Sequence, residues 1–125
     1  MIFQYTWQKV LAGAKTQTRR PAKSSEELWT AEYHGRMPEK VLRQGKRAKW
    51  RTGQRYAVQP GRGQKGLGWI ELLDIRYQHL GNVSEEEAEA EGFSGLAEFI
   101  QVWKRIHGRF DPEQPVWTLE FRLVR

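Results

Sequence analysis

Two strongly patterned segments near the end of the chain constrain its fold most tightly. Apolar residues recur at helical spacing from Leu96 to Ile106, and Gly108 follows as a helix stop. Residues 117–123 then alternate between apolar and polar side chains, which is the period-two pattern of a half-buried strand. The chain therefore contains at least one helix and one strand that must bury their apolar sides against a common core.

The rest of the chain adds helices and strands in mixed order. Helical spacing predicts a short first helix that ends before Gly13, and Ser84 with Glu87 forms a capping box that starts another helix. Strands are expected at residues 54–59 and 69–77. Few strands, separated by helices, favour an α+β domain in which helices close a small curved sheet.

The segment between residues 24 and 53 has the weakest pattern. Residues 24–33 look weakly helical, and residues 34–53 mix glycine, proline and many basic side chains without clear periodicity. We expect a basic loop insertion at 34–53 within a single domain that spans residues 1–125. A globular domain typically runs to roughly 100–200 residues, so a second core has no room.

Absent residue types exclude several classes of site. The sequence has no cysteine, which excludes disulfides, thiolate catalysis and cysteine-based zinc sites. Its three histidines are far apart and lack metal-ligand spacing, so we expect neither a metal nor another cofactor. No apolar run approaches the roughly 20 residues that span a bilayer, and the N-terminus does not resemble a signal peptide. The expectation is a cytoplasmic protein without membrane contact, either monomeric or dimeric.

Charge is distributed very unevenly along the chain. Residues 1–66 carry 15 Lys and Arg against 4 Glu, a net charge of +11, whereas residues 67–125 carry 6 against 11 acidic residues, a net charge of −5. Clustered cations supply the salt-dependent attraction to phosphates that nucleic-acid-binding proteins share. A solvated, solubilising surface has the same composition, so charge alone leaves both interpretations open.

The motif GAKTQTRR, residues 13–20, offers groups that could do chemistry. Gly13 and Ala14 permit a tight turn, and Lys15 and Thr18 can converge if the motif itself turns. If the motif is extended, Thr16 and Thr18 share one face, and Lys15, Gln17 and Arg19 share the opposite one. Threonine is a weak nucleophile that needs a neighbouring base, and a lysine becomes a base only when burial or nearby charge lowers its pKa. Phosphate binding and simple surface coverage are the alternatives for this motif.

A carboxylate on the strand 69–77 is the natural partner for this motif. Trp69, Glu71 and Leu73 lie on the more apolar face, so that face should point inward and bring Glu71 to the core. A buried carboxylate is costly unless it is paired or protonated, and Lys15 or an arginine of the motif could pair with it. The alternative is a bulge that turns Glu71 outward.

The ordered set of motifs resembles the ASCH family. It consists of the first helix with GAKTQTRR, the strand GWIELLDI, the phrase EAEAEGFSGLAEFIQVWKRIHG and the closing PVWTLEF, and the resemblance covers most of the chain apart from the basic stretch near residues 22–50. ASCH domains are similar in fold to PUA domains. The resemblance therefore implies a small PUA-like β-barrel of about five or six strands with flanking helices. It also implies a cleft that the family is thought to use for RNA or nucleotides.

Some members of the family are amidohydrolases that act on N4-acetylcytidine through a lysine, a threonine and a glutamate. The matching positions are Lys15, Thr18 and Glu71, which the resemblance makes base, nucleophile and acid or orienting group. This chain departs from those members in ending its motif with TRR and in its basic insertion. Arg19 and Arg20 beside the cleft would suit a phosphate better than a bare nucleoside.

RNA or nucleotide binding through a basic cleft is therefore the favoured function. The close alternative is a hydrolase, either an amidohydrolase of acylated cytidine or a nuclease. A further alternative is recognition of modified DNA bases, which related PUA-like folds flip out and inspect. Exposed aromatic side chains among basic residues could stack on bases. Candidate nucleic-acid contacts are Arg19, Arg20, Lys23, Trp29, Lys46, Arg47, Trp50, Arg51, Arg62 and Lys65.

The other patterned side chains are expected to be structural. Trp69, Trp103, Trp117 and Phe121 belong to apolar patterns and are predicted to lie in the core. The glutamates between residues 85 and 91 resemble a solvated helix face with favourable charge at the helix N-terminus.

Overall fold

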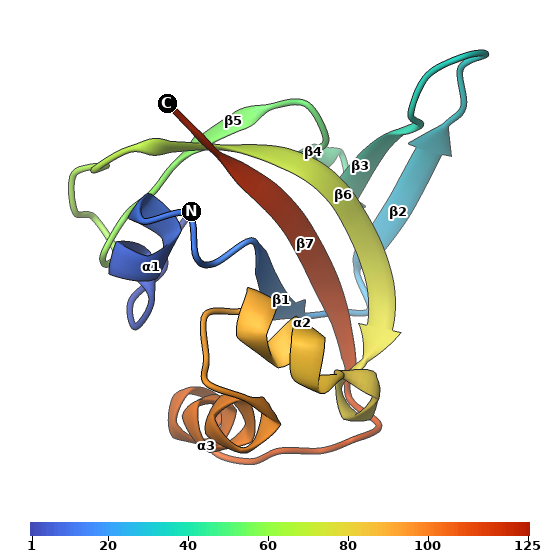
Figure 1. Cartoon of the computed structure of the whole chain (residues 1–125). Helices are drawn as coiled ribbons and strands as arrows, with labels where there is room; N and C mark the ends of the chain where they lie inside the picture. The colour runs from blue at the N-terminus through green and yellow to red at the C-terminus, as the bar shows by residue number, and fades with distance from the viewer.

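A computed structural model describes all residues, 1–125, and contains three α-helices and seven β-strands (Figure 1). In chain order the elements are α1 (Trp7–Leu11), β1 (Gln17–Pro21), β2 (Glu26–Ala31), β3 (Glu39–Gln44), β4 (Arg47–Arg51), β5 (Arg55–Ala57), β6 (Trp69–His79), a short 3₁₀ turn (Leu80–Asn82), α2 (Glu85–Ala90), α3 (Leu96–His107) and β7 (Pro115–Val124).

The strands form two antiparallel sheets, one of order β1-β7-β6-β5 and one of order β2-β3-β4. Polar contacts join them: Trp117 Nε1 donates to Glu26 at 3.1 Å, and Lys40 pairs with Asp74 at 2.8 Å. The α+β class predicted from the sequence is confirmed. The expected barrel of five or six strands is corrected, because the hydrogen-bonded strands number seven and lie in two sheets.

The long strands β6 and β7 pair along their length and curve through the centre of the molecule (Figure 1). The prediction for the inner face of β6 is wrong: Trp69 and Leu73 are 55% and 43% exposed, whereas Ile70 and Leu72 are buried. A register shift after Leu72 then turns Ile75 into the core. The alternation is ambiguous here because apolar residues occupy both faces, and the bulge changes the parity partway along the strand.

The basic insertion is a sheet and not a loop. The weak helix predicted at 24–33 and the loop predicted at 34–53 are replaced by strands β2, β3 and β4. Leu28, Leu42 and Trp50 lie opposite one another across these strands, and all three belong to or pack against the main core. Lysine and arginine at many of the flanking positions obscure the period-two pattern in the sequence.

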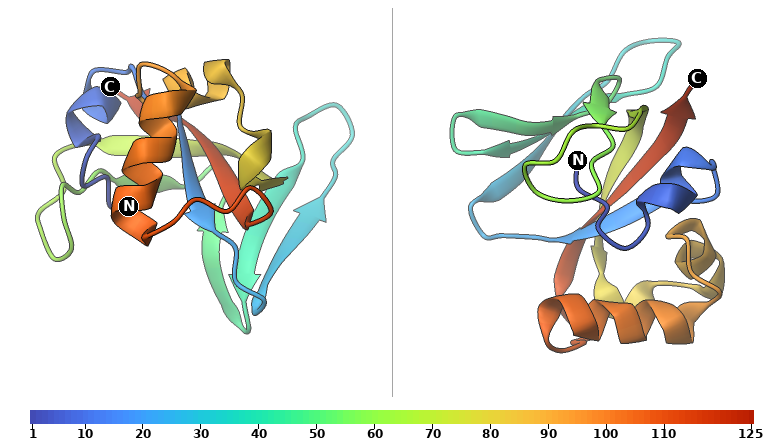
Figure 2. Two further views of the ribbon diagram at one scale, coloured as in Figure 1. Left: turned by 90° about the horizontal axis from the view of Figure 1, so that it is seen from below. Right: turned by 90° about the vertical axis from the view of Figure 1, so that its left-hand side faces the viewer.

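Helices α2 and α3 lie below the central sheet in the right-hand view of Figure 2, whereas α1 lies beside the sheet. The predicted capping box of Ser84 and Glu87 starts α2, and Gly108, at a φ of +86°, ends α3. Trp103 is buried as predicted and, with Phe99, belongs to a second core cluster between the helices and the end of β7. Trp117 and Phe121 are also buried as predicted. None of the helices combines the length and apolarity required to cross a membrane.

Candidate functional site

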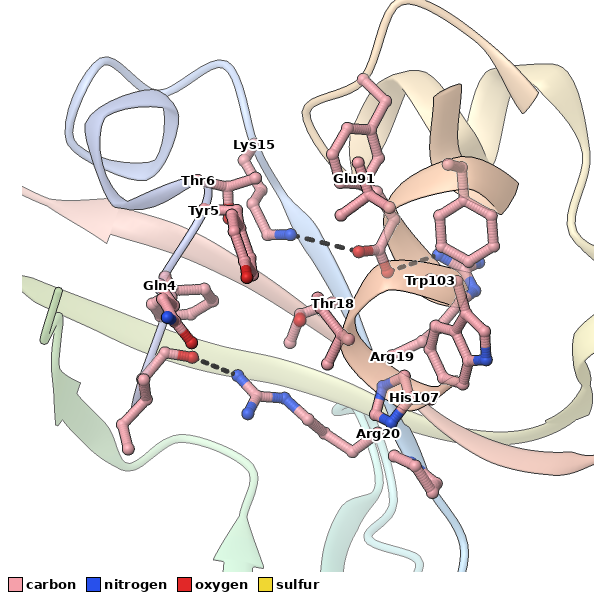
Figure 3. Close-up of a pocket in the computed structure, with 17 residues that line it drawn as sticks. Gln4, Tyr5, Thr6, Lys15, Thr18, Arg19, Arg20, Glu91, Trp103 and His107 are labelled. Atoms are coloured by element: carbon pink, nitrogen blue, oxygen red, sulfur yellow. Dashed lines mark hydrogen bonds and ion pairs between the residues drawn. The ribbon is translucent and has the colours of Figure 1, made fainter. Parts of the chain in front are cut away.

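A cavity of about 190 Å³ opens between the N-terminal segment, β1 and α3 (Figure 3). Phe3, Phe99 and Val102 contribute apolar surface to its lining. Polar and aromatic side chains of these elements, of the turn before β1 and of the residue after α2 also line the cavity; they include Tyr5, Lys15, Thr18, Arg20, Glu91, Trp103 and His107.

A tight turn after α1 brings Lys15 into the cavity. Gly13 has a φ of +77°, which a residue with a Cβ adopts only with strain, and the N–H of Lys15 donates to the Lys9 carbonyl at 3.1 Å. The chain therefore reverses at the end of α1 and enters β1 with Lys15 pointing inward. The tight turn predicted for this motif is present.

Glu91 meets Lys15 because the end of α2 is hydrogen-bonded to the residue after that lysine. The N–H of Thr16 donates to the Ala90 carbonyl at 2.8 Å, and Glu91 comes next in the chain. Its Oε1 lies 3.1 Å from Lys15 Nζ and its Oε2 lies 3.0 Å from Arg19 Nη1 (Figure 3). Glu91, Lys15 and Arg19 are only 4–5% exposed, so the three charges form a buried network.

Burial changes the acid–base character of Lys15. Removal from water disfavours the ammonium form and lowers its pKa, and the neighbouring Glu91 carboxylate only partly opposes this shift. The charges of Arg19 and Arg20 lower the pKa further. The cavity therefore contains a lysine that gives up its proton more readily than an exposed lysine.

Arg19 holds Glu91 in place. Its Nε donates to Gln78 at 3.2 Å, its Nη2 donates to Gln17 at 3.0 Å, and the same Nη2 contacts Glu87. Each of the three guanidinium nitrogens thus has a protein partner. This side chain is a positioning group for Glu91, and its availability to a phosphate is correspondingly low.

Thr18 and Arg20 contribute groups that the protein leaves available. Thr18 lines the cavity, and none of the side-chain hydrogen bonds in the protein engages its hydroxyl. Arg20 donates from Nη2 to the Ile2 carbonyl at 2.8 Å and lies over the Phe3 ring, but its buried Nε has no partner. A buried donor without a partner costs free energy that a ligand acceptor can recover.

Aromatic rings border the cavity. The rings of Trp103 and His107 on α3 lie 4.2 Å apart, and Tyr5 on the N-terminal segment is 46% exposed. Burial lowers the pKa of His107, and the charge of Arg20 lowers it further. The imidazole is therefore mainly neutral at pH 7, when it can both donate and accept hydrogen bonds.

Known proteins resemble this chain in structure but not detectably in sequence. No protein-family model matches the sequence, and no curated protein matches it either. The crystal structure of an ASCH domain from Lactobacillus crispatus JV V101 superposes with a TM-score of 0.68 over 97% of this chain and 74% of that chain, at 16% identity. This chain has the ASCH fold.

A second solved structure with the same arrangement is protein EF3133 from Enterococcus faecalis V583, of family model DUF984. It superposes with a TM-score of 0.60 over 94% of this chain and 66% of that chain, at 20% identity. The resemblance drawn from the motifs is thereby confirmed at the level of the fold.

Within the ASCH fold, the predicted trio of Lys15, Thr18 and Glu71 is only partly brought together. Lys15 and Thr18 line one cavity, but Glu71 lies on the other side of β6 and pairs with Arg122 at 2.8 Å. The expectation that Glu71 meets Lys15 is wrong because β6 buries its other face.

Glu91 supplies the carboxylate, although the sequence interpretation assigned it to a solvated helix face. The signal that could have identified it is its place after the helix, directly before a glycine.

The predicted nucleic-acid contacts fall into separate regions. Trp50 packs inward, with its ring 5.2 Å from that of Tyr56, whereas Trp29 is 55% exposed. Arg19 and Arg20 lie at the cavity, and the exposed cations lie elsewhere: Lys23 precedes β2, Lys46, Arg47 and Arg51 belong to the β3–β4 hairpin, and Arg62 and Lys65 belong to the loop before β6.

Proposed function

We propose that this ASCH-fold chain binds RNA or a nucleotide and holds one nucleobase in the cavity. The observation that supports this most directly is that residues with polar groups without protein partners line the cavity together with aromatic rings; these groups are the Thr18 hydroxyl, Arg20 Nε and Trp103 Nε1. A nucleobase offers a face for stacking and an edge of donors and acceptors, and proteins bind unpaired bases through both.

The size of the cavity fits this ligand class. Its volume of about 190 Å³ is below the roughly 300–1,000 Å³ of pockets for drug-sized ligands. One unpaired base therefore matches it better than a base pair or a folded oligonucleotide. Pro21 lines the cavity and Lys23 is exposed two residues later, so cations follow directly along the chain.

Salt-dependent RNA binding tests the proposal. Anisotropy of a labelled single-stranded RNA should show affinity falling roughly 20-fold between about 50 and 200 mM salt if three phosphates are contacted. Arg20→Ala should weaken binding about 10-fold or more through loss of a charged hydrogen bond. The control Arg122→Ala removes the same charge from an exposed ion pair outside the cavity and should leave most of the affinity intact.

Two results would count against the proposal. Binding that is absent, or insensitive to salt, removes nucleic acid as the ligand. Equal losses for Arg20→Ala and Arg122→Ala would mean that only total charge matters. Stronger competition by duplex DNA with a modified base than by RNA would assign the cavity to DNA bases.

A second candidate is hydrolysis of an acylated cytidine, favoured by the buried Lys15–Glu91 pair beside the free hydroxyl of Thr18. In this scheme Thr18 Oγ attacks the amide carbonyl, and its proton passes to neutral Lys15. The C–N bond breaks as Lys15 returns the proton to the departing cytidine amine, and water then releases the acyl group from Thr18. The lowered pKa of Lys15 favours its role as base.

Incubation with N4-acetylcytidine and measurement of released cytidine tests this second candidate. Turnover should disappear in Thr18→Val and fall strongly in Glu91→Gln. It should persist in Glu71→Gln, because Glu71 lies on the opposite side of β6. No turnover by the wild type excludes the hydrolase while leaving RNA binding to its own test.

A further inference from the structure

The second sheet has an outer face that the core does not use. Leu28, Leu42 and Trp50 point inward, so their neighbours along each strand point outward. Trp29 pairs with Val41, and Val41 pairs with Arg51, which gives an outward row across all three strands. We call this row, together with Arg43, the outer sheet face.

An exposed tryptophan with a neighbouring guanidinium lies on β2, at one edge of the outer sheet face. Trp29 is 55% exposed, and Arg43 lies with its guanidinium carbon 5.1 Å from the Trp29 ring centroid. A solvent-exposed indole on a sheet offers a stacking surface for a base, and an adjacent arginine can contact the phosphate of the same nucleotide.

Charge around the outer sheet face favours a polyanion. Residues 23–57 contain 9 Lys and Arg against 4 Glu, a net charge of +5. Two of these cations, Lys40 and Lys49, pair with Asp74 and Glu26. The other seven are absent from every ion pair in the protein: Lys23, Arg36, Arg43, Lys46, Arg47, Arg51 and Arg55.

We propose that the outer sheet face binds single-stranded RNA that continues from the nucleotide in the cavity. Trp29 would stack on a base, and Arg43 and Arg51 would contact phosphates. The proposal rests on the proposed function of the cavity. Trp29 is nine residues after Arg20, a stretch of chain that spans at most about 30 Å, and single-strand-binding folds engage roughly 4–16 nucleotides.

Two ligands of different length separate the outer sheet face from the cavity. Affinities for a labelled single-stranded RNA of roughly 12 nucleotides and for cytidine 5′-monophosphate are measured for wild type, Trp29→Ala and Trp69→Ala. Trp69 is the matched control, since it is also 55% exposed but lies on β6. Circular dichroism and thermal melting establish that both variants fold.

Trp29→Ala should weaken binding of the longer RNA by between about 5-fold and 150-fold, the range for loss of one stacked base. Its affinity for the mononucleotide should remain that of wild type, and Trp69→Ala should bind both ligands normally. Equal RNA affinity in Trp29→Ala and wild type overturns this inference alone. A dimer that dissociates in Trp29→Ala, with RNA affinity unchanged, assigns the face to a second copy and also overturns it. No RNA binding by wild type overturns the proposed function and this inference together.

Discussion

Lys15 and Arg19 at the cavity are buried and share the carboxylate of Glu91, whereas Arg43 and Arg51 on the outer sheet face have no ion-pair partner. Both regions contain basic side chains, but those at the cavity are buried and paired and those on the outer sheet face are unpaired. The folded protein loses stability if a buried cation loses its carboxylate partner, whereas an unpaired surface cation is available to an anionic ligand. The number of basic residues in a segment therefore does not locate a binding surface; the partners of those residues do.

Breaking the buried network should have the largest effect. Glu91→Ala leaves Lys15 and Arg19 without their shared carboxylate, and loss of one partner from a buried ion pair costs about 3–5 kcal/mol of unfolding free energy. Urea denaturation measures the change. Glu71→Ala breaks the more exposed pair with Arg122 and should cost about 1 kcal/mol or less. A similar loss of unfolding free energy in both variants would contradict the difference between the buried network and the more exposed pair.

A substitution at Thr18 tests ligand binding in the cavity without a change of charge. Thr18→Val keeps the shape of the side chain and removes the hydroxyl, so affinity for cytidine 5′-monophosphate should fall by up to about 10-fold, the loss of one hydrogen bond. Calorimetric titration measures the affinity. Thr30→Val removes an exposed hydroxyl from β2 and should change nothing. A normal affinity in Thr18→Val would exclude this hydroxyl from the ligand contacts.

Low pH should destabilise the protein because it protonates carboxylates that are paired with cations. Burial alone would raise the pKa of Glu26, but hydrogen bonds from Lys49, the Lys23 N–H and Trp117 outweigh burial and lower the pKa below its ordinary value of 4.5. The folded state therefore binds the proton more weakly than the unfolded chain. Stability from Glu26 is fully present above pH 4.5 and is lost as the pH falls through its lowered pKa.

Thermal melting at a series of pH values below 5 measures this loss. Glu26→Gln should reduce the slope of stability against pH, and Lys49→Met should reduce it through the same contact. Slopes equal to that of the wild type in both variants would show that Glu26 does not contribute.

The smallest effect is expected at single surface cations. Arg47→Ala should change the free energy of unfolding by no more than about 0.5 kcal/mol, because the side chain is exposed and unpaired. If it contacts one phosphate, the salt dependence of RNA affinity should decrease by about 0.7 in logarithmic slope. An unchanged slope would place Arg47 outside the RNA path.

The helix α3 and the strand β7 could be predicted from the sequence because each has a single apolar side and a clear period. The inner face of β6 could not, since apolar residues occupy both of its sides and a bulge changes their parity. Lys15 and Thr18 were recognisable within one short motif. Glu91 was not, because its burial depends on contacts with β1 that join residues more than 70 positions apart. The β2–β4 sheet was hidden because three apolar residues define its inner face among many cations.

If this chain binds RNA or a nucleotide as proposed, the cavity beside Lys15 receives a nucleobase. Titration of isotope-labelled protein with cytidine 5′-monophosphate, followed by amide chemical shifts, tests this claim most directly. The largest shifts should occur in the segments that line the cavity, residues 2–6, 15–20, 91–93 and 102–107, with little change in the β2–β4 sheet. Shifts confined to that sheet, or no shifts at any ligand concentration, would contradict the claim.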